Sequence, residues 1–263
     1  MTEAEILARI LPLLSGGPAA LLGPGDDAAV LATPSGHVVA TTDTMVRGLD
    51  WRDDWSSAQD VGHKLMVSNL ADIAAMGGRP TGVLVALAAG RETPLSWVED
   101  LARGIGAAAR GAEVAVLGGD LSSAPDTVIM AAITALGEVP SGEPVRRDGA
   151  QPGDVVAVCG TLGRSGAGLA ILSVKGAEQL SAAERELVDA HRRPVCPLAA
   201  GVQAATEGAS AMIDISDGLL RDADRIARAS GVVIDVSMAA LAPDLGGIAA
   251  VIGPDRAVSA VLG

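Results

Sequence analysis

The alternation of apolar and polar residues divides the chain into two halves. In the first half, stretches with helical periodicity are interleaved with short apolar runs that suit strands. The longest predicted helix, residues 57–76, has Ser56 or Ser57 as its cap and ends at Gly77-Gly78 before Pro80. The other predicted elements of this half are helices over 3–14 and 94–110 and strands over 28–32, 37–42, 81–89, 113–117 and 127–137.

Residues 138–153 are rich in Pro and Gly and poor in apolar side chains, which is typical of a connection between domains. We therefore predict an N-terminal domain over residues 1–138 and a C-terminal domain over residues 139–263. The mixed order of strands and helices in the first half indicates an α+β or α/β domain. In the second, the pattern predicts strands over 154–159, 210–215 and 231–236 and helices over 167–174, 181–191, 197–207 and 218–230.

Composition narrows the classes of function. The 263 residues are 49% hydrophobic, which favours packed domains over disorder, but aromatic residues make up only 1%. The formal net charge of −13 argues against nucleic acid or an anionic membrane as partners. No apolar run reaches 18 residues, the N-terminus is acidic, and Cys159 and Cys196 lack metal-site spacing, so we expect a cytoplasmic protein.

Acidic residues recur at or beside the ends of apolar runs, where an unpaired carboxylate is costly. Because 19 Lys and Arg face 32 Asp and Glu, basic side chains cannot pair with them all. Neighbouring carboxylates without a basic partner repel each other. Several bound Mg²⁺ ions, which prefer oxygen ligands and phosphate, would remove this repulsion. Each segment alone would also fit an ordinary turn or cap. The segments are Gly25-Asp26-Asp27, Thr41-Thr42-Asp43-Thr44, Asn69-Leu70-Ala71-Asp72, Gly118-Gly119-Asp120 and Asp214-Ile215-Ser216-Asp217-Gly218.

Two of these segments carry a spacing argument. Lys64, Ser68 and Asp72 follow one another at intervals of four residues and should share one helix face. In the last segment, strand alternation would place Asp214 and Ser216 on one face, while Ser216 or Asp217 caps a helix that begins at Leu219. Such a helix start is a ready anion site.

Common phosphotransferase motifs are absent from the sequence. The only lysines, Lys64 and Lys175, lie outside any Gly-x-x-x-x-Gly-Lys-Ser/Thr motif, and no protein-kinase catalytic loop occurs. The glycine-rich turn at 160–166 and the pair Arg146-Arg147 could contact phosphate, although a structural turn and a solvated linker explain them as well.

Taken in order, the acidic segments resemble the thiamine-monophosphate kinase family, which is grouped with aminoimidazole ribonucleotide synthetase and selenophosphate synthetase. Further matches are Arg147-Asp148-Gly149-Ala150-Gln151-Pro152-Gly153-Asp154, Gly160-Thr161-Leu162-Gly163 and Ala167-Gly168-Leu169. The resemblance implies transfer of the γ-phosphoryl group of ATP to thiamine monophosphate. It also implies an α/β N-terminal domain and an α+β C-terminal domain. In the homodimer that it implies, the N-terminal sheets of two copies pair into a barrel.

The resemblance also implies roles for particular residues. Asp50 stands where the family has a substrate contact, often His. Gly119, Asp120, Arg147 and Ser216 would contact ATP. Several Mg²⁺ ions would be held by Asp27, Thr41, Thr42, Asp43, Asp72, Asp120, Asp214 and Asp217.

The chemistry implied by the resemblance needs no general base, because a phosphate monoester is largely ionised at pH 7. We therefore expect direct in-line transfer with no phosphoenzyme. Members of the family continue into a Gly-Gly-Glu-Asp-type motif near the point where this chain stops, at Gly263, so the thiamine pocket is expected to lack a wall. A sister synthetase of the same fold group and a non-catalytic Mg-nucleotide-binding module remain as alternatives.

Overall fold

The computed structural model describes residues 5, 9–14, 20–22, 30, 31, 33, 36 and 38–263. Asp26 and Asp27 lie outside these residues. The first half has the elements η1 (Leu11–Leu13), β1 (Ala20–Leu22), β2 (Val30–Leu31), β3 (Val38–Val46), α2 (Ala58–Ala75), β4 (Arg79–Ala89), α3 (Leu95–Ala112), β5 (Ala115–Ser123) and β6 (Ile129–Glu138). The second half has α4 (Arg164–Lys175), α5 (Ala182–Arg192), α6 (Leu198–Thr206), α7 (Leu219–Ser230), α8 (Ala242–Ile252) and α9 (Pro254–Leu262).

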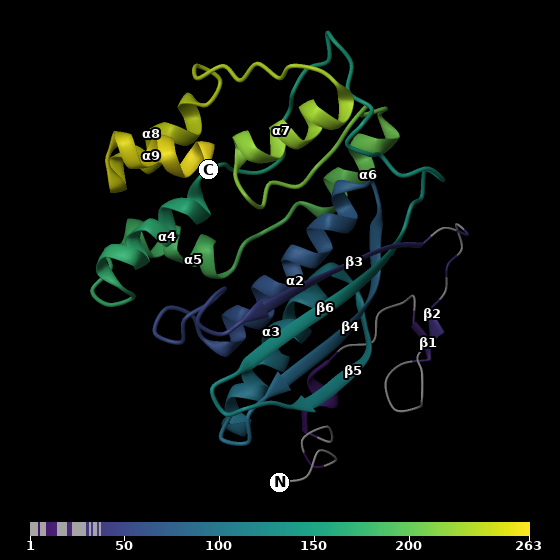
Figure 1. Ribbon diagram of the computed structural model, residues 1–263, viewed down its shortest axis with the longest axis vertical. Coiled ribbons are helices and arrows are strands. Elements are labelled where there is room, and N and C mark those ends of the chain that lie inside the picture. Colours follow the sequence, from purple (N-terminus) through teal and green to yellow (C-terminus); the bar gives the residue numbers. More distant parts are fainter. Residues whose placement is uncertain are drawn as a thin grey trace.

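A four-stranded mixed sheet forms the centre of the first half (Figure 1). Its strand order is β3-β6-β4-β5; β4 pairs parallel with β5, and the other neighbours pair antiparallel. The parallel pair is joined through α3, and both α2 and α3 lie on one face of the sheet. This arrangement is the sheet-and-helix domain that the sequence predicts.

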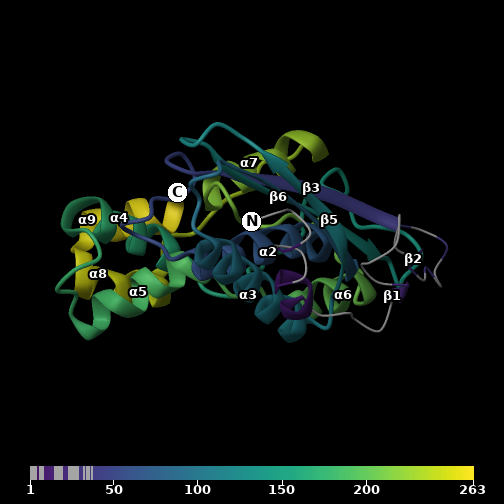
Figure 2. The same cartoon turned by 90° about the horizontal axis from the view of Figure 1, so that it is seen from below.

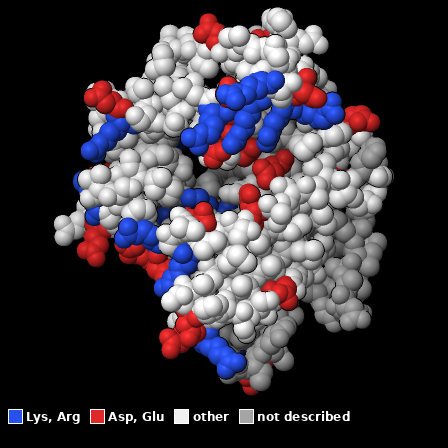
Figure 3. All heavy atoms as spheres, viewed as in Figure 1, with Lys and Arg blue, Asp and Glu red and all other residues white. Residues whose placement is uncertain are grey.

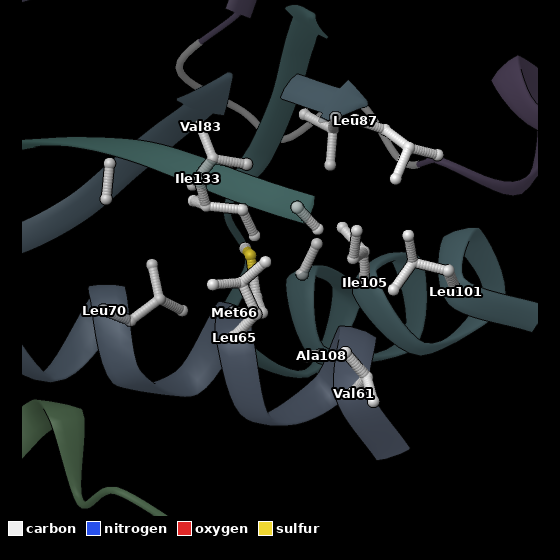
Figure 4. Packing of buried hydrophobic residues seen from close by; sticks show 14 of the residues in the cluster. Val61, Leu65, Met66, Leu70, Val83, Leu87, Leu101, Ile105, Ala108 and Ile133 are labelled. Carbon is white, nitrogen blue, oxygen red and sulfur yellow. The ribbon is translucent and has the colours of Figure 1, made fainter. Parts of the chain in front are cut away.

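The first core lies between this sheet and the two helices. Leu65, Met66 and Leu70 of α2 turn toward Val83 and Ile133 of the sheet (Figure 4). All of them are at most 1% exposed, and each such burial stabilises the fold by about 1.5–3 kcal/mol.

The two helices α2 and α3 pack closely because a glycine stands on each side of their crossing. A Cβ added at Gly62 would lie 2.3 Å from the carbonyl oxygen of Leu101, and one at Gly104 would lie 2.1 Å from that of Gln59. Any larger side chain would push the helices apart.

The N-terminus of α2 is fixed by a reciprocal cap. The Ser57 hydroxyl accepts a hydrogen bond from the Asp60 amide, and the Asp60 carboxylate accepts one from the Ser57 amide. Both the predicted cap and the predicted stop near Gly77 are confirmed.

The second half packs as a separate helical cluster (Figure 2). Its core joins α4, α5, α8 and α9 through Leu172, Val188, Ile248 and Val261. In contrast, α6 packs against the first half, since a Cβ at Gly201 would lie 2.1 Å from the carbonyl oxygen of Ala74.

The strands predicted for the second half are wrong. Residues 154–159, 210–215 and 231–236 run without helix, yet none forms a strand in the described part of the chain. A strand needs a ladder of backbone hydrogen bonds to a neighbour, and the described part of the chain gives these segments no such ladder: the Met212 amide donates to the Arg146 carbonyl at 3.3 Å without a strand pairing around it. Val155 and Val233 are 91% and 93% exposed. The α+β description of this half is therefore not met, and α8 and α9 are elements that the sequence pattern does not predict. No helix among the described residues is long and apolar enough to cross a membrane.

Candidate active site

The helix α2 holds an acidic residue against the strand β3. The Thr41 hydroxyl donates to the carboxylate of Asp72 at 2.8 Å, and the Asp43 amide donates to the side chain of Asn69 at 2.9 Å. Asn69 is fully buried, and its own amide donates to the Leu65 carbonyl at 2.8 Å. These bonds hold Thr41, Asp43 and Asp72 together across two elements.

The second half adds Asp214 to this group. Burial, followed by the charge of Asp72, raises the pKa of Asp43. Burial, then Asp72 and Asp222, raise the pKa of Asp214 to about 6, while Arg147 acts in the opposite direction. Asp72 therefore interacts with carboxylates from both halves, and Arg147 lies near enough to Asp214 to influence its pKa.

The side chains of this acidic group are of the chemical type that a hard divalent cation prefers. Carboxylate oxygens that raise each other's pKa values lose that repulsion when a cation lies between them. Among the described residues, however, no three His, Cys, Asp or Glu side chains are close enough to enclose one ion. The Mg²⁺ site thus stays a prediction, with Asp43, Asp72 and Asp214 as its best-supported members.

The turn before α7 differs from its prediction. Gly218 stands at the helix cap, and no side chain caps the first turn. Instead the fully buried carboxylate of Asp222 accepts the amides of Ser216 and Asp217, each at 3.0 Å. Asp217 cannot cap because its carboxylate forms an ion pair with Arg225.

Asp222 is therefore the residue of this turn that sequence reasoning missed. Its position in the first turn of α7, where acidic residues stabilise a helix, is the signal that could have found it. It also forms an ion pair with Arg225 at 2.6 Å, so its charge is compensated.

Gly119 and Asp120 lie inside β5 and not at its end. A Cβ at Gly119 would lie 1.7 Å from the Val85 carbonyl oxygen, so the close approach of β4 requires this glycine. The Asp120 carboxylate accepts the Ser122 hydroxyl at 2.6 Å. No hydrogen bond in the described part links Asp120 to the acidic group around Asp72.

Thr42 faces away from that group. Its hydroxyl donates to the Ile133 carbonyl at 3.0 Å and accepts the Thr134 hydroxyl at 3.2 Å. Because side chains alternate along a strand, Thr42 lies on the opposite face of the sheet from Thr41 and Asp43. The structure thus does not bring its side chain together with Asp72.

A cavity of about 410 Å³ lies between the two halves. Asp50 lines it and accepts the Val46 amide at 2.7 Å, which closes the turn after β3. Trp51 stacks on Trp97, and the guanidinium of Arg52 lies 4.4 Å from the centre of the Trp55 ring. The lining residues are Met45, Gly48, Leu49, Asp50, Trp51, Arg52, Trp55, Ser56, Asp60, Val61, Lys64, Leu169, His191 and Arg192.

Charged side chains gather around a hollow near the middle of one face of the molecule (Figure 3). Across the two halves, Arg193 pairs with Asp60, and His63 Nε2 lies 3.0 Å from the Pro194 carbonyl oxygen. These contacts connect α2 to the segment after α5. Arg164, at the start of α4, does not contribute to this connection, because it pairs with Glu186 of α5 at 3.8 Å.

Comparisons with known proteins first identify the class. The family model described as AIR synthase related protein, N-terminal domain, matches residues 25–139, and the corresponding C-terminal domain matches residues 151–250. The chain is therefore a two-domain AIR synthase related protein with a mixed sheet and helices.

Individual relatives identify the family. Thiamine-monophosphate kinase of Mycobacterium tuberculosis (strain CDC 1551 / Oshkosh) is 46% identical over 224 residues, 85% of this chain and 65% of that relative. The enzyme of Corynebacterium glutamicum is 42% identical over 236 residues, 88% of this chain and 71% of that relative. The chain belongs to the thiamine-monophosphate kinase family. It spans about two thirds of the length of these relatives.

Solved structures agree with this assignment. The crystal structure of thiamine-monophosphate kinase from Stenotrophomonas maltophilia K279a superposes with a TM-score of 0.80 at 32% identity, covering 98% of this chain and 80% of that one. A structure described as AaThiL complexed with AMPPCP and TMP gives a TM-score of 0.76 at 31% identity, covering 90% and 75%.

Proposed function

We propose that the protein transfers the γ-phosphoryl group of ATP to thiamine monophosphate, giving thiamine diphosphate. The observation that carries this proposal is the acidic group of Asp43, Asp72 and Asp214, which comes from both halves and includes Asp72 of α2, the helix that also lines the cavity. The related AaThiL structure, with AMPPCP and TMP, supports the pairing of substrates.

In this proposal the two substrates occupy different parts of the site. Gly119, Asp120, Arg147 and Ser216 contact ATP. Thiamine monophosphate enters the cavity, where Asp50 contacts its organic part. Asp43, Asp72 and Asp214 would hold Mg²⁺, together with the other residues that the family resemblance implies, Asp27, Thr41, Thr42, Asp120 and Asp217. When bound, Mg²⁺ would neutralise the phosphate charges.

The transfer itself is direct and in line. The acceptor phosphate is largely ionised at pH 7 and attacks without a general base, so the side chains only bind and orient the two substrates. No phosphoenzyme forms. If this is right, labelled ADP will not exchange into ATP until thiamine monophosphate is added.

The outward face of the sheet supports the proposed homodimer. Val38, Leu84 and Met130 lie on the face opposite α2 and α3 and are 50%, 40% and 37% exposed. We expect Leu84→Glu to convert a dimer to a monomer in light scattering. Leu220→Glu, an exposed site on α7, serves as the matched control, and a dimer that survives Leu84→Glu would refute this interface. The free thiols of Cys159 and Cys196 are compatible with the proposed cytoplasmic location.

The decisive experiment measures thiamine diphosphate formed from ATP, Mg²⁺ and thiamine monophosphate. The wild type should form product, Asp43→Asn and Asp214→Asn should not, and Asp235→Asn should retain activity because Asp235 is exposed on the second half. Mg²⁺-dependent ATP binding without product would instead favour the non-catalytic module. Product from aminoimidazole ribonucleotide precursors would favour the sister synthetase.

A further inference from the structure

Lys64 forms no ion pair with any of the residues that the structure describes. It lies on α2, lines the cavity, and is one of only two lysines in the chain. No carboxylate oxygen of a described residue lies within 4.0 Å of its ammonium group. Burial lowers the pKa of Lys64, against the opposing influence of Asp50. A partly desolvated ammonium of this kind is suited to an anionic ligand.

The hydrogen bonds around Lys64 fix a neighbouring histidine. The Lys64 ammonium lies 3.4 Å from His191 Nε2, and His191 Nδ1 lies 3.1 Å from the Ser165 hydroxyl. Because an ammonium can only donate, Nε2 must accept, and the ring proton must then be on Nδ1, from which it is donated to Ser165. Burial, followed by the charge of Lys64, lowers the pKa of His191 to about 4, which agrees with a neutral ring.

This chain of contacts joins both halves of the protein. Ser165 is on α4, His191 is on α5 and Lys64 is on α2. His191 accepts one N–H of the Lys64 ammonium. The other two N–H groups of Lys64 are the ones that we assign to a ligand in the cavity.

A second donor lies at the same cavity. The Nε of Arg192 is buried and has no hydrogen-bond partner among the described residues, and a buried donor left in this way is unfavourable. By comparison, Arg52 at the cavity is already held by both carboxylate oxygens of Asp54, at 2.9 and 2.7 Å. In the part of the chain that the structure describes, Arg192 reaches a carboxylate only through Nη1, which lies 4.0 Å from Asp189, so Lys64 and the Nε of Arg192 are the donors that we assign to an anion here.

The position of Lys64 suits the phosphate end of an acceptor. Eight residues separate it from Asp72 on the same helix, a rise of about 12 Å. An acceptor whose organic part contacts Asp50 would carry its phosphate between Lys64 and the acidic group.

We propose that Lys64 and Arg192 bind the phosphate of the monophosphate acceptor and that His191 is the residue that positions Lys64. This proposal rests on the function proposed above. It adds that the protein distinguishes a phosphorylated from an unphosphorylated acceptor at this point of the cavity.

The test compares two ligands that differ by the phosphate alone. Calorimetry measures the binding of thiamine monophosphate and of thiamine to the wild type, Lys64→Met and the control Lys175→Met. We expect Lys64→Met to weaken binding of thiamine monophosphate by about 10–100-fold, the range for a charged hydrogen bond, and to leave thiamine binding unchanged. Lys175→Met should match the wild type, and Lys64→Gln provides a second neutral variant if Lys64→Met unfolds.

The variants of His191 test its positioning role. His191→Gln retains a hydrogen-bonding side chain and should keep most of the preference for thiamine monophosphate over thiamine. His191→Leu cannot form the hydrogen bond and should lose this preference. The ¹⁵N signals of the His191 ring should report a neutral ring with the proton on Nδ1, and a proton on Nε2 would overturn this role.

The outcomes separate the two proposals. A wild type that does not bind thiamine monophosphate overturns the proposed function and this inference with it. A wild type that prefers thiamine monophosphate, with the same preference in Lys64→Met, overturns the inference alone. Equal losses for both ligands would show that Lys64 has only a structural role, which also overturns it.

Discussion

Replacing Asp214 with Asn should stabilise the metal-free protein. Burial and the charges of Asp72 and Asp222 raise the pKa of Asp214 from its ordinary 3.8 to about 6. Such a change corresponds to roughly 3 kcal/mol at pH values above both pKa values. Because Asp214 is only partly buried, solvent screens this interaction, and we expect about half, roughly 1.5 kcal/mol.

The sign follows from proton binding. The folded protein holds the Asp214 proton more tightly than the unfolded chain, so ionisation disfavours the folded state. The penalty is absent well below pH 3.8, grows between pH 3.8 and about 6, and is complete above that. The neutral amide of the Asp214→Asn variant would avoid the penalty at every pH. The difference between variant and wild type should therefore be largest at pH 8 and about half as large at pH 5.

Thermal unfolding in EDTA provides the assay. At about 2–4 °C for each kcal/mol, the melting temperature of Asp214→Asn should exceed that of the wild type by about 3–6 °C at pH 8. Asp235→Asn removes the same charge from an exposed position and should change little. A variant no more stable than the wild type at pH 8, or a difference independent of pH, would refute the reasoning. Added Mg²⁺ should then stabilise the wild type more than the variant.

Other predictions follow from single contacts. Asp222→Asn should lower the free energy of unfolding by about 2–3 kcal/mol in urea titrations, because it removes a buried charge that accepts two backbone amides and pairs with the half-exposed Arg225. Asp224→Asn, whose partner Arg228 is exposed, should cost less than about 1 kcal/mol, and equal effects of the two changes would contradict this. Gly119→Ala should lower the free energy of unfolding by about 1–3 kcal/mol, because the added methyl group would collide with β4. The control Gly246→Ala, in open space on α8, should be neutral or stabilising. If both variants were neutral, the packing argument would be wrong. Asp72→Asn should weaken Mg²⁺ binding at least about tenfold in calorimetry, and unchanged affinity would exclude Asp72 as a ligand.

The first half could be predicted well because its elements carry local signals. The cap at Ser57, the stop at Gly77 and the apolar periodicity between them define α2 almost to the residue. The strands β4 and β6 could also be predicted, since apolar residues fill them. The strand β5 extends further than the sequence predicts, because Gly118-Gly119 suggests a turn, whereas the glycines instead permit close approach to β4.

The second half could not be predicted to the same degree. An apolar run such as residues 154–159 favours a strand, but pairing with a neighbour is a property of the fold and not of the run. The helices α8 and α9 are built from small residues with little periodic contrast, so the pattern does not mark them.

The candidate site could be predicted in parts. The spacing of Lys64, Ser68 and Asp72 predicts a shared helix face, but only the family resemblance puts Asp43 and Asp72 in one set of ligands. The burial of Asp222 and the link from Lys64 to His191 depend on residues far apart in the chain, which no local pattern reveals.

The helix α2 fixes the distance between the two parts of the candidate site. Its residues face the cavity at Lys64 and the acidic group at Asp72, and the distance between them is set by backbone hydrogen bonds, not by adjustable side chains. Inserting one residue would lengthen the interval by about 1.5 Å but would also rotate Asp72 by about 100° away from β3. The interval therefore cannot be changed in small steps. If Lys64 binds the acceptor phosphate as proposed, this fixed interval would select acceptors by length.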